Sequence, residues 1–324
     1  MRVLSGIQPS GPLHIGNYFG ALKQFIELQH KNEAYYFVAD FHALTSVRDP
    51  KLLREYTHDV IVTMLSLGLD PDRATLFVQS DVPETTELAW LLSTVTPMGW
   101  LEKCVSYKDK IQQGLPAEHG LFAYPVLQAA DILLYDADLV PVGQDQKQHL
   151  EITRDVAERF NRVYGGESEV FRLPKPYILE TSAVVPGLDG RKMSKSYGNT
   201  IEIFDEPAVI RKKAKKIVTD STPVDAPKNP ETCPLFAMFA LFATPEQRAQ
   251  MDLRYRQGGV GYGEVKGLLA EAMIAHFEAA REQRRQWLAQ PQRVREVREA
   301  AAAKARATAR VVLDRARVAC GVGS

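Results

Sequence analysis

The stretch Val3-Leu4-Ser5-Gly6-Ile7-Gln8-Pro9-Ser10-Gly11-Pro12-Leu13-His14-Ile15-Gly16-Asn17 decides the fold. Its apolar start, residues 3–7, predicts a buried strand, and a loop rich in glycine and proline follows. Apolar residues then recur at helical spacing over residues 15–29. Free backbone N–H groups and the positive end of a helix dipole would meet where this helix begins, which suits an anion. An ordinary strand-to-helix connection fits the stretch equally well, because it has neither GxGxxG nor GxxxxGK[ST].

Polar side chains lie where that helix is expected to begin. His14 and Asn17 stand beside the turn, and Gly16 has no Cβ, so a ligand can approach the backbone closely. The alternative is a surface histidine at a plain connection.

The first half of the chain alternates between strand and helix patterns. Strands are expected at residues 34–40, 74–80 and 137–143, and helices at 50–67, 85–94 and 144–160. This order predicts a parallel sheet covered by helices. Because ligands bind at the carboxyl ends of such strands, polar residues that follow strands should share one crevice. These residues are His14, Asp40, Ser80 and 143–146.

The second half is helical, which fits the two domains that 324 residues suggest. Helices are expected at residues 206–217, 233–242, 245–257, 263–290 and 292–318. We therefore predict an α/β domain over residues 1–200, with an insertion around 98–120, and an all-helical domain over 201–324.

Charge and cysteine content narrow the class of protein. Lys+Arg and Asp+Glu both number 40, but residues 265–324 hold twelve Lys and Arg against six Asp and Glu. This basic segment indicates a polyanionic partner or, equally, an arginine-rich solvated helix face. Cys104, Cys233 and Cys320 have no metal-binding or disulfide spacing, which favours a reducing cytoplasm. No signal peptide or membrane span is expected.

A second loop carries the other charged motif, Gly187-Leu188-Asp189-Gly190-Arg191-Lys192-Met193-Ser194-Lys195-Ser196-Tyr197-Gly198-Asn199. Glycines flank Arg191, Lys192 and Lys195. Ammonium groups on such a loop can close on a phosphate chain and follow its charge during a reaction. A solvated basic loop is the alternative.

Together, the two motifs resemble the signatures of class I aminoacyl-tRNA synthetases. HIGN at residues 14–17 is similar to the HIGH element with its last histidine replaced by Asn17, and KMSKS at 192–196 matches letter for letter. Further segments resemble the tryptophanyl-tRNA synthetase family in order: VADFHALT, LFVQSDVPE, YPVLQAADILLY and LVPVGQDQKQHLEITRD. The resemblance implies a Rossmann-like catalytic domain, a C-terminal helical domain that binds the tRNA anticodon, a cytoplasmic location and a homodimer.

The chemistry that this resemblance implies fits the residues. Such an enzyme activates L-tryptophan with ATP, releases pyrophosphate and transfers the amino acid to the 3′ end of tRNA(Trp). The attacking carboxylate is already ionised, so no general base is needed, and catalysis becomes positioning and charge stabilisation. No metal-ligand cluster is expected in the protein, and Mg²⁺ would arrive on the nucleotide.

Site residues follow from the same resemblance. The catalytic set is His14, Asn17, Lys192 and Lys195, with Lys110 either reaching the phosphates or being simply exposed. The expected ATP-binding residues are Gln8, Ser10, Gly11, His14, Gly16, Asn17, Lys110, Gly143, Gln144, Asp145, Lys192, Met193, Ser194, Lys195 and Ser196.

The amino acid should bind along the helix expected at residues 124–135. Tyr124, Gln128, Asp131 and Tyr135 share one face of it. Asp131 lies in an apolar run, where an unpaired carboxylate is costly. It therefore has a structural partner or awaits a ligand donor; the resemblance favours the indole N–H. The expected tryptophan-binding residues are His42, Tyr124, Gln128, Asp131, Val140, Val142 and Gln146, although His42 fits an ordinary loop position and both valines also fit strand core.

Two departures leave specificity open. Gln128 stands where many relatives carry methionine, and Gln144 where many carry glutamate. Tyrosine is therefore the nearest competing substrate.

Other hypotheses for the function are a small-molecule nucleotidylyltransferase and a non-catalytic RNA-binding relative. The complete KMSKS and the long basic helical segment argue against the first, and intact His14, Lys192 and Lys195 against the second. The basic run at 211–216 fits a tRNA contact or, slightly better, a solvated face.

Overall fold

The computed structural model describes residues 1–324 except 105, 106, 108–111, 113, 115, 144, 145, 167, 179–183 and 324. It divides into two compact units, which are described separately. The sheet unit comprises residues 1–10, 25–180 and 287–324, and the helical unit comprises residues 11–24 and 181–286.

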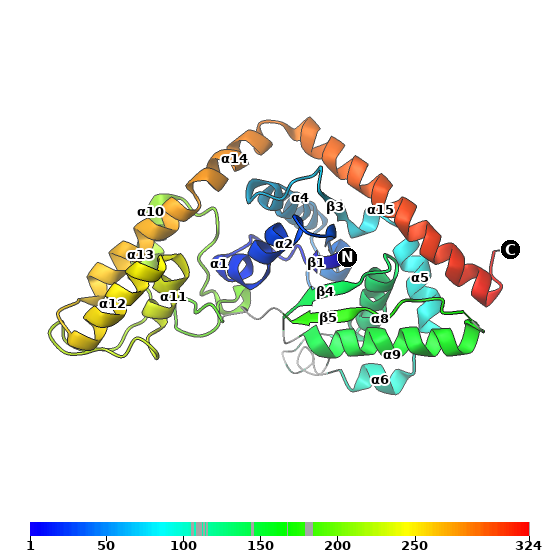
Figure 1. Ribbon diagram of the computed structural model, residues 1–324, viewed down its shortest axis with the longest axis horizontal. Helices are drawn as coiled ribbons and strands as arrows, with labels where there is room; N and C mark the ends of the chain where they lie inside the picture. Colours follow the sequence, from blue (N-terminus) through cyan, green and yellow to red (C-terminus); the bar gives the residue numbers. More distant parts are fainter. Residues whose placement is uncertain are drawn as a thin grey trace. The chain divides into compact units, whose positions relative to one another are not determined.

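A parallel five-stranded sheet of order β3-β2-β1-β4-β5 forms the centre of the sheet unit (Figure 1). All pairings are parallel, as the sequence predicts. The register sets Ile7 beside Val38 and Val38 beside Val78, so the chain leaves three neighbouring strands at one edge. The strands are β1 (Arg2–Ile7), β2 (Glu33–Val38), β3 (Ala74–Val78), β4 (Leu139–Val142) and β5 (Lys175–Ile178).

Helices follow the strands as expected. Asp49 caps α4 through the backbone N–H groups of Lys51 and Leu52, and Pro50 takes its first position. The predicted helix at residues 15–29 is interrupted: α1 (Ile15–Asn17) and α2 (Lys23–Leu28) are separated by a π-helical turn, η1 (Tyr18–Leu22). The remaining helices here are α3 (Asp40–Ala43), α4 (Pro50–Ser66), η2 (Gln79–Asp81), α5 (Glu84–Ser93), α6 (Met98–Glu102), α8 (His119–Leu133) and α9 (Lys147–Tyr164).

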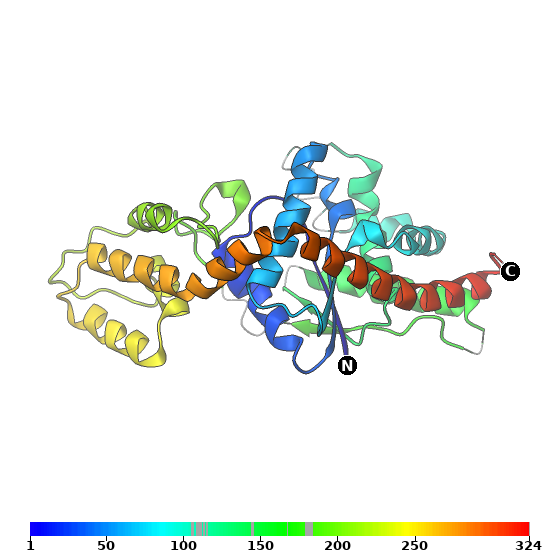
Figure 2. The ribbon, with the colours of Figure 1, turned by 90° about the horizontal axis from the view of Figure 1, so that it is seen from above.

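The last helix, α15 (Pro291–Cys320), belongs to the sheet unit. It lies along β3 and α5 (Figures 1 and 2). Ala301, Ala305 and Ala309 recur every fourth residue, and these small buried side chains let the helix approach the core closely. The division of the structure therefore differs from the predicted boundary at residue 200. The assignment of a catalytic and a tRNA-binding domain concerns function and stays a prediction.

Five arginines of α15 pair with acids of the sheet unit. Arg306 and Arg310 both bond Glu84, which is 7% exposed, and Arg317 holds Glu87 with two bonds. Arg298 and Arg315 bind Asp81 and Asp136 in the same way. Much of the basic character of residues 265–324 thus has a structural role that neither sequence interpretation contained.

The helical unit holds α1 and a group of later helices. α13 packs against α10 and α11. One predicted helix at residues 263–290 is two helices, because the chain departs from helical geometry at Phe277 (φ −100°, ψ 10°). The later elements are η4 (Lys195–Tyr197), α10 (Pro207–Lys215), α11 (Pro234–Phe242), α12 (Pro245–Gln257), α13 (Tyr262–His276) and α14 (Glu278–Leu288). Within the described residues, no helix is both long and apolar enough to cross a bilayer.

Candidate active site

The first signature is a reciprocal cap in the helical unit. The His14 backbone N–H donates to Asn17 Oδ1 at 3.0 Å, and the Asn17 backbone N–H donates to His14 Nδ1 at 3.3 Å. This reciprocal pattern is a capping box, in which each side chain bonds a backbone N–H at the start of α1. Asn17 therefore orients His14, whatever else it binds.

His14 is held neutral. Burial, aided by the positive charge of Lys195, lowers the pKa of His14 from 6.5 to about 4. Since Nδ1 accepts a hydrogen bond, the ring proton of the neutral form is on Nε2. His14 can therefore donate to a phosphate oxygen but has no proton to give as an acid near neutral pH.

Gly16 is required by packing within the protein. A Cβ at this position would lie 2.9 Å from His14 Nδ1 and 3.3 Å from Met193 Cβ. The imidazole and the buried Met193 thus occupy the space that a side chain would need. The sequence interpretation, which kept this space for a ligand, did not contain this contact.

The KMSKS loop is built around Asn199. This buried side chain donates to Asp189 Oδ1 at 2.7 Å and to the Lys192 carbonyl at 3.1 Å, and it accepts from the Ser194 backbone N–H at 2.8 Å. A Cβ on Gly187 would lie 2.3 Å from Asn199 Nδ2, so this glycine is needed for the contact. The role of Asn199 was not predicted, because nothing in the local sequence shows that this residue is buried.

The two signatures meet in the helical unit. Lys195 Nζ donates to the Gly11 carbonyl at 2.7 Å. Strand-like bonds join their flanks: Ile15 N–H to the Ile201 carbonyl at 3.0 Å, and Ile203 N–H to the Leu13 carbonyl at 3.1 Å. The result is a corner of hydrogen-bond donors and positive charge around His14 and Lys195, and Lys192 is exposed on the same loop as Lys195. Such a corner suits a polyphosphate.

A second constellation lies in the sheet unit, around Asp131 of α8. Asp131 is 2% exposed, and burial raises the pKa of its carboxyl while the bonds from His42 and Gln79 oppose that rise. His42 Nε2 lies 2.8 Å from Oδ2, and Gln79 Nε2 donates to both oxygens at 2.8 and 2.9 Å. A carboxylate has about four acceptor positions, so these partners leave capacity for one more N–H donor.

Two other predicted residues, Gln8 and Tyr124, contact His42 of this constellation. Gln8 Nε2 donates to the His42 carbonyl at 3.4 Å, and the Tyr124 hydroxyl bonds His149 Nε2 at 2.8 Å. Val140 is buried in β4, so it is strand core, and Gln128 is half-buried on α8. Ser10 belongs to the sheet unit, while Gly143 and Gln146 lie between β4 and α9.

For some predicted site residues the structure gives little or no description. Lys110, Gln144 and Asp145 lie outside the described residues, and of Val142 only its place in β4 is described. The structure also adds Gln79, which sequence reasoning missed. The signal was present, since Gln79 directly follows the β3 residue Val78 at the edge where ligands bind.

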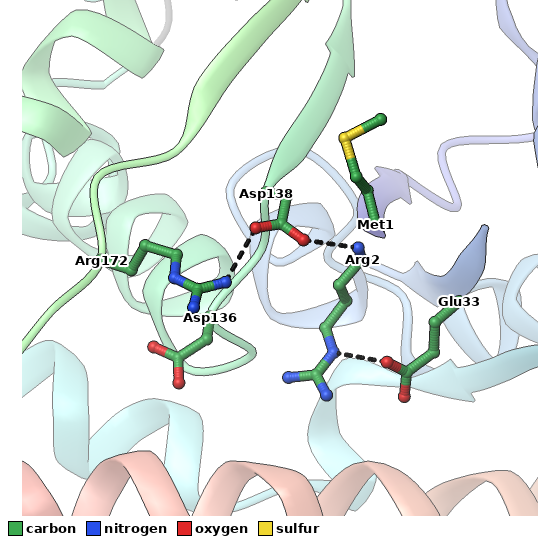
Figure 3. Close-up of a pocket in the computed structure, with 6 residues that line it drawn as sticks. All are labelled: Met1, Arg2, Glu33, Asp136, Asp138 and Arg172. Carbon is green, nitrogen blue, oxygen red and sulfur yellow. Dashed lines mark hydrogen bonds and ion pairs between the residues drawn. The ribbon is translucent and has the colours of Figure 1, made fainter.

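A separate polar hollow of about 390 Å³ lies where β1, β2 and β4 begin (Figure 3). Four of its charged side chains pair with one another: Arg2 Nε with Glu33 at 3.1 Å, and Arg172 with Asp138 at 2.8 Å. Asp138 also accepts from the Arg2 backbone N–H at 2.8 Å. These bonds tie β1 to its neighbours, so we assign the hollow a structural role.

Comparisons with known proteins identify the class. The family model "tRNA synthetases class I (W and Y)" matches residues 1–278. The chain therefore belongs to the class I tRNA synthetases of the tryptophan and tyrosine type.

Similar full-length proteins narrow the class to one branch. The chain is 52% identical to the tryptophan–tRNA ligase of Rhodopirellula baltica, covering 99% of this chain and 100% of the relative. Identity to that of Fusobacterium nucleatum is 49%, covering 99% and 98%. The tryptophanyl-tRNA synthetase of Campylobacter jejuni, solved with ADP and tryptophan, superposes with a TM-score of 0.92 at 46% identity and covers 99% and 100%. The resemblance to the tryptophanyl-tRNA synthetases is confirmed, and so is the Rossmann-like fold.

The pKa of His14 has a consequence for stability. Because it is lower in the folded chain, the unfolded chain binds a proton that the folded chain does not between pH 6.5 and about 4. Stability should therefore fall as the pH falls through this window. In His14→Gln this contribution is absent, so urea unfolding at about pH 7.5 and about pH 5 should show a smaller loss in the variant. Equal losses in both proteins would contradict the neutral, buried imidazole.

Proposed function

We propose that this chain is a tryptophan–tRNA ligase that forms tryptophanyl-adenylate and pyrophosphate and then transfers tryptophan to tRNA(Trp). The observation that carries the proposal is the buried Asp131 carboxylate, held by His42 and Gln79 with acceptor capacity left for an indole N–H. The full-length similarity to tryptophan–tRNA ligases supports the same reaction.

Adenylate formation needs charge stabilisation rather than proton transfer. The amino acid carboxylate attacks the α-phosphorus of ATP and forms a bond to it. The bond between the α-phosphorus and the oxygen that bridges to the β-phosphorus breaks, and pyrophosphate leaves with the negative charge. In the proposed mechanism, Lys195 and Lys192 stabilise that charge, and neutral His14 donates from Nε2 to a phosphate oxygen. Its pKa of about 4 supports this role, since the ring stays neutral at working pH.

Magnesium fits this mechanism as part of the nucleotide. Mg²⁺ prefers carboxylate, phosphate and water oxygens, whereas the corner formed by His14 and the KMSKS loop offers ammonium, imidazole and hydroxyl groups. We therefore propose that ATP enters as its magnesium complex and that the ion is held by phosphate oxygens. The lysines then share the charge of the triphosphate with it.

The partners of the enzyme are tRNA(Trp) and a second copy of the chain. We propose that the helices of residues 201–324 contact tRNA in the cytoplasm, where translation takes place.

The proposed homodimer is supported by an open hollow of about 490 Å³ on the sheet unit, which suits an apolar contact. Trp90 and Leu44 line this hollow and are 71% and 47% exposed. Sedimentation in solution measures the mass, and a single-chain mass would contradict the dimer.

The function is tested by amino-acid-dependent exchange of pyrophosphate into ATP. Tryptophan should support exchange, whereas tyrosine and phenylalanine should be slower by about 100-fold or more, because neither presents an indole N–H to Asp131. Exchange with tyrosine alone would place the chain with the tyrosine enzymes. No exchange with any of the three would contradict the enzymatic proposal.

The lysine loop is tested separately. Lys195→Ala should slow adenylate formation by about 100-fold and leave the tryptophan Kd within about twofold, because the ammonium acts on the leaving phosphate. Single-turnover kinetics and equilibrium binding give the two quantities. Lys216→Ala, at an exposed lysine of the same unit, should change neither. Equal losses of rate and tryptophan affinity would remove the transition-state role.

A further inference from the structure

The short turn η2 connects three parts of the sheet unit through three consecutive residues. Gln79 Nε2 donates to both oxygens of Asp131 at 2.8 and 2.9 Å. The Ser80 backbone N–H donates to Asp40 Oδ1 at 3.0 Å. The Asp81 carboxylate binds the Arg298 guanidinium of α15 with bonds of 2.6 and 2.7 Å. One turn therefore joins the C-terminal helix to the carboxylate that we assign to tryptophan recognition.

Gln79 has one orientation that satisfies its amide. Its side chain is 1% exposed, and the Phe41 backbone N–H donates to Oε1 at 3.1 Å. With the amide oxygen used in this way, the amide nitrogen points to Asp131. A small rotation of η2 would break both bonds, so the place of the backbone determines whether Gln79 holds the carboxylate.

The Arg298–Asp81 pair is built to fix that backbone. A guanidinium that donates in parallel to both oxygens of a carboxylate defines its plane as well as its distance. Arg298 extends from a helix that is anchored independently, since Ala301 and Ala305 are buried in the core and Arg306 bonds Glu84. The Arg298–Asp81 ion pair therefore connects α15, which is fixed in the core, to η2, the turn that carries Gln79.

We propose that Arg298 and Asp81 are positioning residues for amino acid recognition: they set η2 so that Gln79 orients Asp131 toward an indole N–H. The inference rests on the proposed function, because it assigns Asp131 to tryptophan. In this proposal α15 contributes to amino acid specificity through η2, although Arg298 touches no substrate. The role of Arg298 is distinct from that of the other α15 arginines that pair with acids of the sheet unit, since the partners of those arginines lie on α5 or before β4.

The test is Arg298→Gln in the full chain, assayed by pyrophosphate exchange. The KM for tryptophan should rise about fivefold, and kcat and the KM for ATP should stay within about twofold, because a partly exposed pair that orients one turn affects binding of one substrate. Arg317→Gln is the matched control. Arg317 lies on the same helix, is equally paired through two 2.6 Å bonds to Glu87, and contacts α5 instead of η2. It should leave the KM for tryptophan unchanged.

A double-mutant cycle separates positioning from general stability. If Arg298 acts through Gln79, then Arg298→Gln should have no further effect on the KM for tryptophan in a Gln79→Ala background. Arg298→Lys, which keeps the charge without the fork, should fall between wild type and Arg298→Gln and covers the case in which the glutamine variant folds poorly. An unchanged KM in Arg298→Gln and Arg298→Lys, an equal rise in Arg317→Gln, or the same rise in both backgrounds would overturn the inference.

The same assay distinguishes the inference from the proposed function. Wild-type exchange with tryptophan tests the function, and a failure there contradicts it before any variant is made. Tryptophan-dependent wild-type exchange combined with an unaffected Arg298→Gln overturns the inference alone.

Discussion

The proposed recognition of tryptophan depends on one set of contacts, the hydrogen bonds that hold the Asp131 carboxylate between His42 and Gln79. A carboxylate that is 2% exposed would be costly alone, and three short bonds offset that cost. They also fix the direction of its remaining acceptor capacity. A site built in this way selects a donor of defined position and rejects molecules that lack it, because the buried oxygen would then lose its partner.

The proposed phosphate-binding region around His14 and Lys195 is also held in place by contacts within the protein, but its charge is positive. Burial and the charge of Lys195 hold His14 neutral, Asn17 fixes its ring through Nδ1, and Asn199 shapes the loop that brings Lys195 to the Gly11 carbonyl. Glycine is needed at position 16 because His14 and Met193 fill the space beside it. Several residues of the two signatures are thus fixed by contacts within the protein, and His14 Nε2 and the Lys192 ammonium are not used by these hydrogen bonds.

Local patterns in the sequence predicted most of the sheet unit. Apolar runs gave the strands at β1, β2 and β3, and the two signatures gave His14 and Lys195, because these signals are contained in a few consecutive residues. Gln79 and Asn199 were missed because a polar residue in a loop shows no sign of burial until distant chain segments cover it. The place of α15 was missed for the same reason. Its alanine stripe and arginines read as a basic helix, and only the acids at positions 81, 84 and 87 decide what those arginines bind.

The most direct test of the central claim replaces the indole N–H in the substrate and leaves the protein unchanged. The analogue 3-(1-benzothiophen-3-yl)alanine has nearly the shape of tryptophan but carries sulfur where the donor should be. With this analogue, kcat/KM for pyrophosphate exchange should be lower by about 100-fold or more, and Asp131→Ala should largely remove the difference. Equal kcat/KM values for tryptophan and the analogue in the wild-type protein would contradict the assignment of Asp131 as the acceptor of the indole N–H.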